Sequence, residues 1–160
     1  MGYIVAQITE IASRTIPQAP NVVLINGGTN DGIKNLDVAH TGERMDHLID
    51  GLYEQIPGTT VILSTLLPNA NASHAQVNTD WINDQYRAIF KRRQAQNQRI
   101  VLAEMVGAVT AAHMNTDDHT HPTDEGYVRM AEVWYEALIE AEWRQFLQRP
   151  KFPVNDTVCP

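Results

Sequence analysis

The segment MNTDDHTHPTDEGY, residues 114–127, brings acidic side chains and histidines together just before an expected helix. Asp118 and His121 are three residues apart, so the carboxylate can accept the ring N–H, fix the tautomer and stabilise the imidazolium. A pair of this kind activates a serine or cysteine nucleophile in acyl transfer. The alternative is a polar loop whose Asp and His only cap the helix and face water, and one short motif does not decide between the two.

The residues after His121 predict how that histidine is oriented. Pro122 is expected in the first turn of the following helix, where its missing N–H is not needed. Thr123 is expected to cap the helix, while Asp124 and Glu125 favour its positive end. A histidine placed directly before such a helix has a defined orientation.

A second polar cluster, GGTND at residues 27–31, follows a short apolar run. Asn30 lies just past the end of the expected strand, where its side-chain amide could donate to an oxyanion, an interaction worth roughly 3–4 kcal/mol in a transition state. Gly27 and Gly28 would let the backbone turn sharply. The alternative is a strand-to-helix turn selected for turn propensity alone, since Gly, Asn and Asp dominate turns.

A metal site in the segment 113–121 is an alternative interpretation. His113, Asp117, Asp118, His119 and His121 lie close together in the sequence, and His and Asp are zinc ligands. No helical His-x-x-x-His pair and no set of thiolates fixes a geometry there. We expect no metal or organic cofactor, although a metal-dependent hydrolase remains an alternative. The other three histidines, His40, His47 and His74, show no evident partner in the sequence.

The sequence contains no evident nucleophile. Its only serines are Ser13, Ser64 and Ser73, and none of them lies in a Gly-x-Ser-x-Gly elbow. Ser13 falls in an expected helix, Ser64 in an expected strand, and Ser73 has no helix to brace it. The single cysteine, Cys159, lies near the C-terminus. We therefore expect the nucleophile to lie outside this chain.

Helices and strands alternate along the chain. Continuous apolar runs predict strands buried on both faces at residues 21–27, 59–68 and 99–106. Apolar residues at 3–4 spacing predict helices over 3–16, ended by Pro17, over 43–56, from about Thr79 to 98, and from about 127 to 138. Within the last two we expect Trp81 and Tyr127 to face the core. The pattern predicts an α/β fold, a parallel sheet between layers of helices, with one domain over residues 1–148 and an irregular tail over 149–160.

The predicted topology brings the polar segments to one edge. The carboxyl ends of parallel strands meet there, so GGTND, PNANASH (68–74) and the loop ending in DDHTHP should lie close together. In contrast, the run VVLI at 22–25 is too apolar for an exposed edge strand, which would promote aggregation. Only a helix precedes it, so we expect another strand to pair with it, with self-association through this edge as one possibility.

The composition of the chain argues against some classes of binding partner. The formal net charge of −7 argues against nucleic acid or an anionic membrane surface as a partner. No apolar run approaches the roughly 20 residues of a membrane span, and the N-terminus has no signal-peptide pattern. Two glycosylation sequons, Asn71-Ala72-Ser73 and Asn155-Asp156-Thr157, are weak indications of secretion.

GGTND followed by DDHTHPTDEGYVRMAEVW resembles the SGNH (GDSL) hydrolase superfamily, and the connecting sequence resembles the secreted acetylxylan esterases of carbohydrate esterase family 3. The likeness runs from about Asn21 to Leu138. It implies a three-layer α/β/α sandwich, flavodoxin-like, of which this chain holds the last three strands. It also implies that Asn30 donates to the oxyanion, His121 is the general base and Asp118 is its orienting partner.

The same resemblance places the Gly-Asp-Ser nucleophile block and a second oxyanion glycine upstream of Met1. The family's first strand would then be the missing neighbour of VVLI. The function it implies is deacetylation of an acetylated carbohydrate such as xylan by Ser-His-Asp acyl transfer, in a secreted protein whose 160 residues alone are inactive. The alternative is a non-catalytic fragment that binds a ligand or a partner strand.

Overall fold

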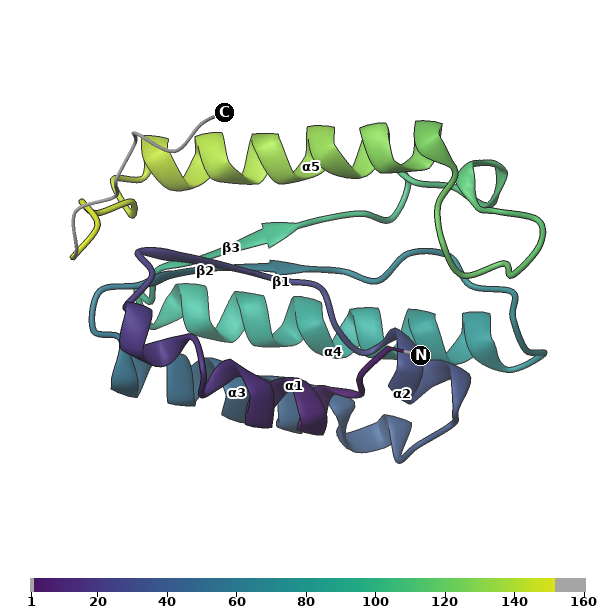
Figure 1. Ribbon diagram of the computed structural model, residues 1–160, viewed down its shortest axis with the longest axis horizontal. Helices are drawn as coiled ribbons and strands as arrows, with labels where there is room; N and C mark the ends of the chain where they lie inside the picture. Colours follow the sequence, from purple (N-terminus) through teal and green to yellow (C-terminus); the bar gives the residue numbers. More distant parts are fainter. Residues whose placement is uncertain (1, 152–160) are drawn as a thin grey trace.

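Three parallel strands form the centre of the protein. The computed structural model describes residues 2–151. Strands β1 (Val22–Ile25), β2 (Thr60–Ser64) and β3 (Ile100–Ala103) pair in the order β1-β2-β3 (Figure 1). Val23 lies opposite Val61, and Leu63 lies opposite Leu102. The three strands predicted from apolar runs are therefore confirmed.

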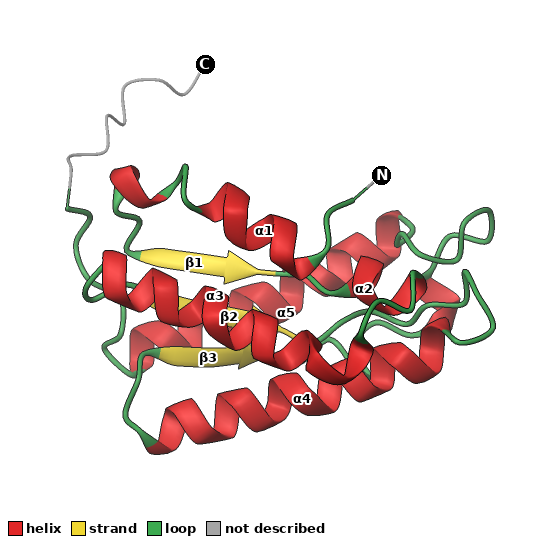
Figure 2. Ribbon diagram, turned by 90° about the horizontal axis from the view of Figure 1, so that it is seen from below, coloured by secondary structure: helices red, strands yellow, loops and turns green. Residues whose placement is uncertain are grey.

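Helices cover both faces of the sheet. On one face lie α1 (Val5–Ala12), α3 (Thr41–Gln55) and α4 (Ala75–Ala95), and on the other face lies α5 (Asp124–Trp143), as Figures 1 and 2 show. The short helix α2 (Thr29–Ile33) follows β1, and 3₁₀ turns occupy Ile16–Gln18, Val38–His40 and Ala111–His113. The predicted α/β/α layers are confirmed, while α2 was not predicted.

Two hydrophobic clusters fill the space between the layers. β2 is buried along its whole length, and its side chains alternate between the clusters, which is why it appears as an unbroken apolar run. Val61 and Leu63 pack with α3 and α4, whereas Ile62 packs towards α5. The α5 cluster contains the buried residues Ile62, Val101, Ala103, Met105, Ala137 and Ala141.

Two predicted helix boundaries were wrong. The first helix ends at Ala12, and Pro17 lies in the 3₁₀ turn after it. α4 begins at Ala75 and not near Thr79, because its first turns are buried against α2: Ala75 is fully buried, and the amide of Asn78 donates to the Gly32 carbonyl oxygen at 2.9 Å.

Two aromatic residues predicted to face the core do not. Trp81 and Tyr127 are each 51% exposed. The buried side of α4 carries Ile82 and Tyr86 and leaves Trp81 on the opposite side. Tyr127 lies in the first turn of α5, which extends past the ends of the strands, so the sheet does not cover it (Figure 1).

β1 is the edge of the described sheet. Within residues 2–151 no strand pairs with its outer side, and Leu24 is 43% exposed. The apolar edge expected from VVLI is therefore present in the structure. Such an edge offers unpaired backbone N–H and C=O groups to another strand.

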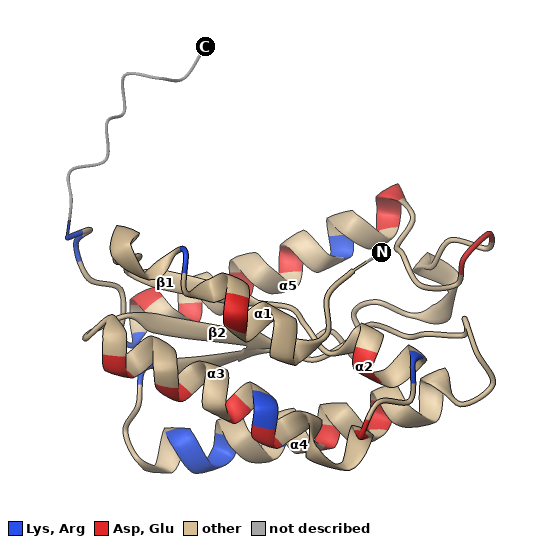
Figure 3. Ribbon diagram, turned by 60° about the horizontal axis from the view of Figure 1, so that its bottom comes forward, with Lys and Arg blue, Asp and Glu red and all other residues tan. Residues whose placement is uncertain are grey.

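Charged residues are distributed unevenly. Figure 3 shows Asp and Glu on every long helix, whereas Lys and Arg gather at the C-terminal end of α4. Two of these, Arg92 and Arg93, pair with Asp46 of α3, and Arg93 also pairs with Asp50. Within the described chain, no helix combines the length and apolar character needed to cross a membrane.

α4 fixes the backbone at the end of β1. The hydroxyl of Tyr86 donates to the Gly27 carbonyl oxygen at 2.8 Å in a fully buried position, where burial raises the pKa of the phenol well above its usual value. Gly28 has a φ of 116°, and a Cβ there would lie 2.6 Å from the Tyr86 hydroxyl. Only glycine fits this turn.

Tyr86→Phe is expected to lower the free energy of unfolding by about 1–3 kcal/mol, because it leaves the buried Gly27 carbonyl without a donor. Urea denaturation measures the change. The matched control is Tyr135→Phe, since Tyr135 is 65% exposed and should change stability little. Equal effects of the two substitutions would contradict the role given to Tyr86.

Candidate active site

Asp118 and His121 form the predicted pair in the loop before α5. Asp118 Oδ2 lies 2.6 Å from His121 Nδ1, and Asp118 Oδ1 accepts the backbone N–H groups of Thr120 and His121 at 2.9 Å each. The side chain of His121 is 68% exposed, and its Nε2 makes no hydrogen bond within residues 2–151. Because Nδ1 contacts the carboxylate, Nε2 is the ring nitrogen that faces away from Asp118.

The carboxylate of Asp118 is held in its ionised form. The His121 backbone N–H, the His121 ring and the Thr120 backbone N–H lower the pKa of Asp118 to about 2. Asp118 is therefore negative at neutral pH, as a partner that stabilises an imidazolium must be.

Hydrogen bonds within this loop and at its junction with α5 hold the loop in place. The N–H of Asn115 donates to the His121 carbonyl at 2.8 Å, and Thr123 caps the helix by accepting the N–H of Gly126 at 3.2 Å. The predicted cap is confirmed, with Asp124 and Glu125 in the first turn. The position predicted for Pro122 was wrong: it precedes the cap, because the helix begins two residues after it.

Asn30 lies in α2, just beyond the carboxyl end of β1. Its side-chain amide donates to the Tyr3 carbonyl oxygen at 3.2 Å. In Figure 1, α2 and the loop before α5 both lie at the end to which the strands point. The predicted shared edge is thus present, although no hydrogen bond within the described residues joins Asn30 to Asp118 or His121.

Gly2 lies directly against this amide, and no sequence pattern singled it out. A Cβ on Gly2 would lie 2.5 Å from Asn30 Nδ2, so a larger residue could not occupy the position without displacing Asn30. The resemblance led us to expect an oxyanion glycine upstream of Met1. The structure shows that a glycine next to Asn30 is already present within the chain.

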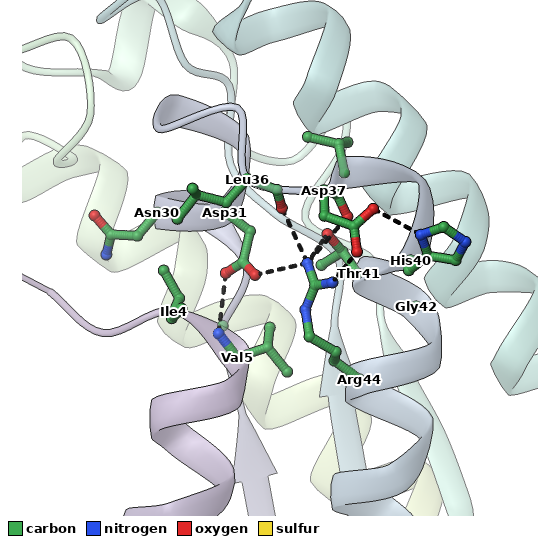
Figure 4. A network of polar contacts seen from close by, with 12 residues as sticks. Ile4, Val5, Asn30, Asp31, Leu36, Asp37, His40, Thr41, Gly42 and Arg44 are labelled. Carbon is green, nitrogen blue, oxygen red and sulfur yellow. Dashed lines mark hydrogen bonds and ion pairs between the residues drawn. The ribbon is translucent and has the colours of Figure 1, made fainter.

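Asp31, the residue after Asn30, has a buried side chain whose two oxygens are both hydrogen-bonded. The sequence pattern did not indicate this role. Figure 4 shows Asp31 between two helices: Oδ2 accepts the N–H of Val5 at 3.0 Å, and Oδ1 accepts Arg44 Nη2 at 3.1 Å. The side chain of Asp31 has no exposed surface. A carboxylate at the first turn of α1 also complements the positive end of that helix.

Arg44 extends this network along the chain (Figure 4). Its guanidinium donates to the Leu36 carbonyl, to Thr41 Oγ1 and to the carboxylate of Asp37. Asp37 in turn lies 2.6 Å from His40 Nδ1, and this contact lowers the pKa of Asp37 and raises that of His40. The expectation that His40 lacks a partner was therefore wrong.

His74 has a partner too, since its Nε2 lies 2.8 Å from the Ile33 carbonyl oxygen at the end of α2. The structure does not bring together the five candidate metal ligands of the segment 113–121. Within residues 2–151, no three His, Cys, Asp or Glu side chains are placed to hold a metal ion. Of the five, Asp118 and His121 contact each other, and His119 adopts a φ of 52°.

The three serines lie in different surroundings. Ser64 is fully buried and accepts Asn26 Nδ2 at 2.8 Å, and Ser13 donates to the Glu10 carbonyl at 2.6 Å. Ser73 is exposed in the turn before α4. No serine of the described chain is hydrogen-bonded to His121. Cys159 and the sequon at Asn155 lie outside the described residues.

A groove of 520 Å³ runs along the free edge of β1 to the site. α1 forms one wall with Ile8 and Ile11, and β1 forms the other with Leu24. Asn30 and Gly2 line one part of it. The groove therefore connects the unpaired strand edge with the candidate oxyanion donor.

The shifted pKa of Asp118 predicts a pH dependence. A folded-state pKa of about 2, below the usual 3.8, means that the interaction stabilises the fold above about pH 4 and is lost as the pH falls towards 2. At about pH 3.5 the ¹³Cγ chemical shift of Asp118 should still be that of a carboxylate. A carboxyl group more than half protonated at that pH would contradict the geometry.

Asp31→Asn is expected to lower the free energy of unfolding by about 2–3 kcal/mol, since one amide cannot accept from both Arg44 and Val5 without turning its own N–H groups towards a donor. Asp37→Asn is the matched control, because Asp37 also binds Arg44 but is 61% exposed. Urea denaturation of both variants compares them. If the control loses as much stability as Asp31→Asn, burial of Asp31 is not the cause.

Several solved structures share the fold of this chain. A mutant acetyl esterase with an acetate ion superposes with a TM-score of 0.77 at 18% identity, over 89% of this chain and 70% of that chain. A carbohydrate esterase family 3 protein from Talaromyces cellulolyticus superposes with a TM-score of 0.75 at 18% identity, over 86% of this chain and 67% of that chain. A family 3 carbohydrate esterase from Clostridium thermocellum superposes with a TM-score of 0.74 at 19% identity, over 91% of this chain and 69% of that chain. At such identities these structures establish the shared fold.

No curated protein matches the sequence. The family model of the GDSL-like Lipase/Acylhydrolase family matches residues 3–129, which is most of the chain and includes Asn30, Asp118 and His121. With the α/β fold and the Asp–His pair in place, the chain belongs to the GDSL-like lipase/acylhydrolase family, within the SGNH superfamily.

Proposed function

We propose that this protein is a carboxylic-ester hydrolase that removes acetyl groups from an acetylated carbohydrate such as xylan. The observation that carries the proposal is the 2.6 Å contact between Asp118 and His121, which leaves His121 Nε2 free at the carboxyl edge of the sheet. The substrate class is supported by the structural neighbours, among them an acetyl esterase, two family 3 carbohydrate esterases and an acetylxylan esterase from Geobacillus stearothermophilus.

In this proposal His121 is the general base. A serine hydroxyl attacks the ester carbonyl while its proton passes to Nε2, and Asp118 stabilises the resulting imidazolium through Nδ1–H. The proton then passes to the leaving alcohol of the sugar, and water repeats the sequence to release acetate. No metal or organic cofactor takes part.

Asn30 stabilises the oxyanion of the tetrahedral intermediate. Its amide carries two hydrogens, and one of them is used on the Tyr3 carbonyl oxygen. The other is available to a developing negative charge, and the position of the amide is fixed by the neighbouring buried Asp31. Gly2 is close enough for its backbone to form part of the same pocket.

The nucleophilic serine, in this account, belongs to a segment outside these 160 residues. Two observations support that assignment: no described serine is bonded to His121, and the groove beside β1 leaves a strand edge open. A parallel strand added there would direct its carboxyl end towards Asn30. The 160 residues alone would then lack esterase activity. We also propose secretion, supported by the exposed position of the sequon residue Asn71.

A second candidate is a non-catalytic protein whose groove binds a partner strand, including that of a second copy. The exposed Leu24 and the apolar walls of the groove favour it, because they offer a binding surface whether or not a serine is supplied. Such a protein binds independently of His121. The two candidates are therefore separated by the effect of this one side chain.

A chimera tests the enzymatic proposal. The part of the Talaromyces cellulolyticus esterase that precedes its region of superposition with this chain is fused ahead of Met1, and hydrolysis of p-nitrophenyl acetate is measured. We expect activity from the chimera and none from the 160-residue chain. His121→Ala should lower kcat by at least about 10³-fold, since it removes the base.

The matched control is His119→Asn, which removes a histidine two residues away and keeps a residue type that tolerates the positive φ at this position. It should retain activity within a few-fold. A folded chimera with no activity, or one equally active with His121→Ala, would overturn the assignment of the pair.

A further inference from the structure

The loop after β2, residues 65–74, lies against the loop that carries the Asp–His pair. Three hydrogen bonds connect them: Asn71 Nδ2 donates to the Asp118 carbonyl at 3.1 Å, the Ala70 N–H donates to the His119 carbonyl at 3.1 Å, and Asn69 Nδ2 donates to Thr120 Oγ1 at 3.3 Å. The three acceptors are the consecutive residues Asp118, His119 and Thr120, which directly precede His121.

The donating loop is itself firmly fixed. Asn69 is only 2% exposed, and its Oδ1 accepts the N–H of Asn71 at 3.0 Å. The N–H of Asn69 donates to the side chain of Gln76 in the first turns of α4 at 2.9 Å, and Gln76 is held in turn by Asp80 at 2.8 Å. The two asparagines are thus attached to the longest helix of the protein.

The accepting loop needs such an attachment. It is largely exposed, His119 has a φ of 52°, and the carboxylate of Asp118 must accept two backbone N–H groups while Oδ2 reaches His121 Nδ1. Rotation of the peptide groups at 118–120 would separate these donors from the carboxylate. The bonds from Asn71 and Asn69 oppose that rotation at both ends of the short segment.

We propose that Asn71 and Asn69 are positioning residues that hold the Asp118–His121 pair in its hydrogen-bonded geometry. They act through the loop backbone and Thr120, and no contact with substrate is required of them. The relevance of this role to catalysis rests on the proposed function, whereas the positioning itself is a property of this chain.

Amide hydrogen exchange of the 160-residue chain tests the positioning directly. The protein is produced in a host that does not N-glycosylate, because Asn71 lies in a sequon. Asn71→Ala should accelerate exchange of the Thr120 and His121 amides, which donate to Asp118 Oδ1, by about 2–10-fold. Amides of β2 should be unchanged.

Two further variants sharpen the test. Asn71→Asp keeps the size of the side chain but directs a carboxylate at the Asp118 carbonyl, so it should loosen the loop more than Asn71→Ala. Ser73→Ala is the matched control from the same loop, because the Ser73 side chain makes no hydrogen bond within the described residues and its loss also removes the sequon.

The same substitutions in the chimera give the catalytic readout. Asn71→Ala should lower kcat about tenfold with KM unchanged, because the base is misplaced while substrate contacts remain. If the chimera is inactive, the proposed function fails, and hydrogen exchange still decides the positioning role. Exchange at Thr120 and His121 that stays within error of the wild type, or an Asp variant no worse than Ala, would overturn the inference.

Discussion

The buried carboxylate of Asp31 is the interaction on which the arrangement of the site depends. It accepts from the first turn of α1 and from Arg44 of α3 while it belongs to α2, so three helices meet at one side chain (Figure 4). A charge with no exposed surface is tolerable only when it is paired and hydrogen-bonded, and here both oxygens are satisfied. Because Asn30 is the preceding residue, this network also fixes the candidate oxyanion donor.

Different interactions hold the two halves of the candidate site, Asn30 and the Asp118–His121 pair, in position. Asn30 is held by the buried Asp31 network and by Tyr86, which fixes Gly27 from α4. The Asp118–His121 pair is exposed and is held by local backbone bonds and by the loop that follows β2. Exposed loops open at lower free energy than buried elements, so the Asp118–His121 pair is the more easily displaced half of the candidate site. The proposed esterase needs both halves aligned at once, and this places the larger demand on the loop.

The fold and the local part of the site could be predicted from the sequence. Buried strands and amphipathic helices have periodicities that identify them, and Asp118 and His121 are only three residues apart, so spacing alone brings them together. Thr123 could be recognised as a cap for the same reason. The network of Asp31 and Arg44 could not be predicted, nor could the contact of Gly2 with Asn30, because these depend on how separate helices approach one another.

The exposure of Tyr127 shows a related limit. Helical periodicity indicates which residues share a face, but the core is defined by how far the sheet extends beneath the helix. The open edge of β1, in contrast, was predicted. The apolar sequence VVLI indicated that a neighbouring strand is needed, and the structure shows a groove of 520 Å³ where such a strand would lie. This groove is also lined by Asn30, the candidate oxyanion donor.

The central claim is that this chain carries the general base and the oxyanion donor, whereas the nucleophilic serine is not one of its residues. Treatment of the purified 160-residue protein with a fluorophosphonate, followed by peptide mass spectrometry, tests it most directly, because such probes modify serines activated by a neighbouring base. The account predicts no modification of Ser13, Ser64 or Ser73. Labelling of any of them that disappears with His121→Ala would show that the nucleophile lies within this chain and would contradict the account.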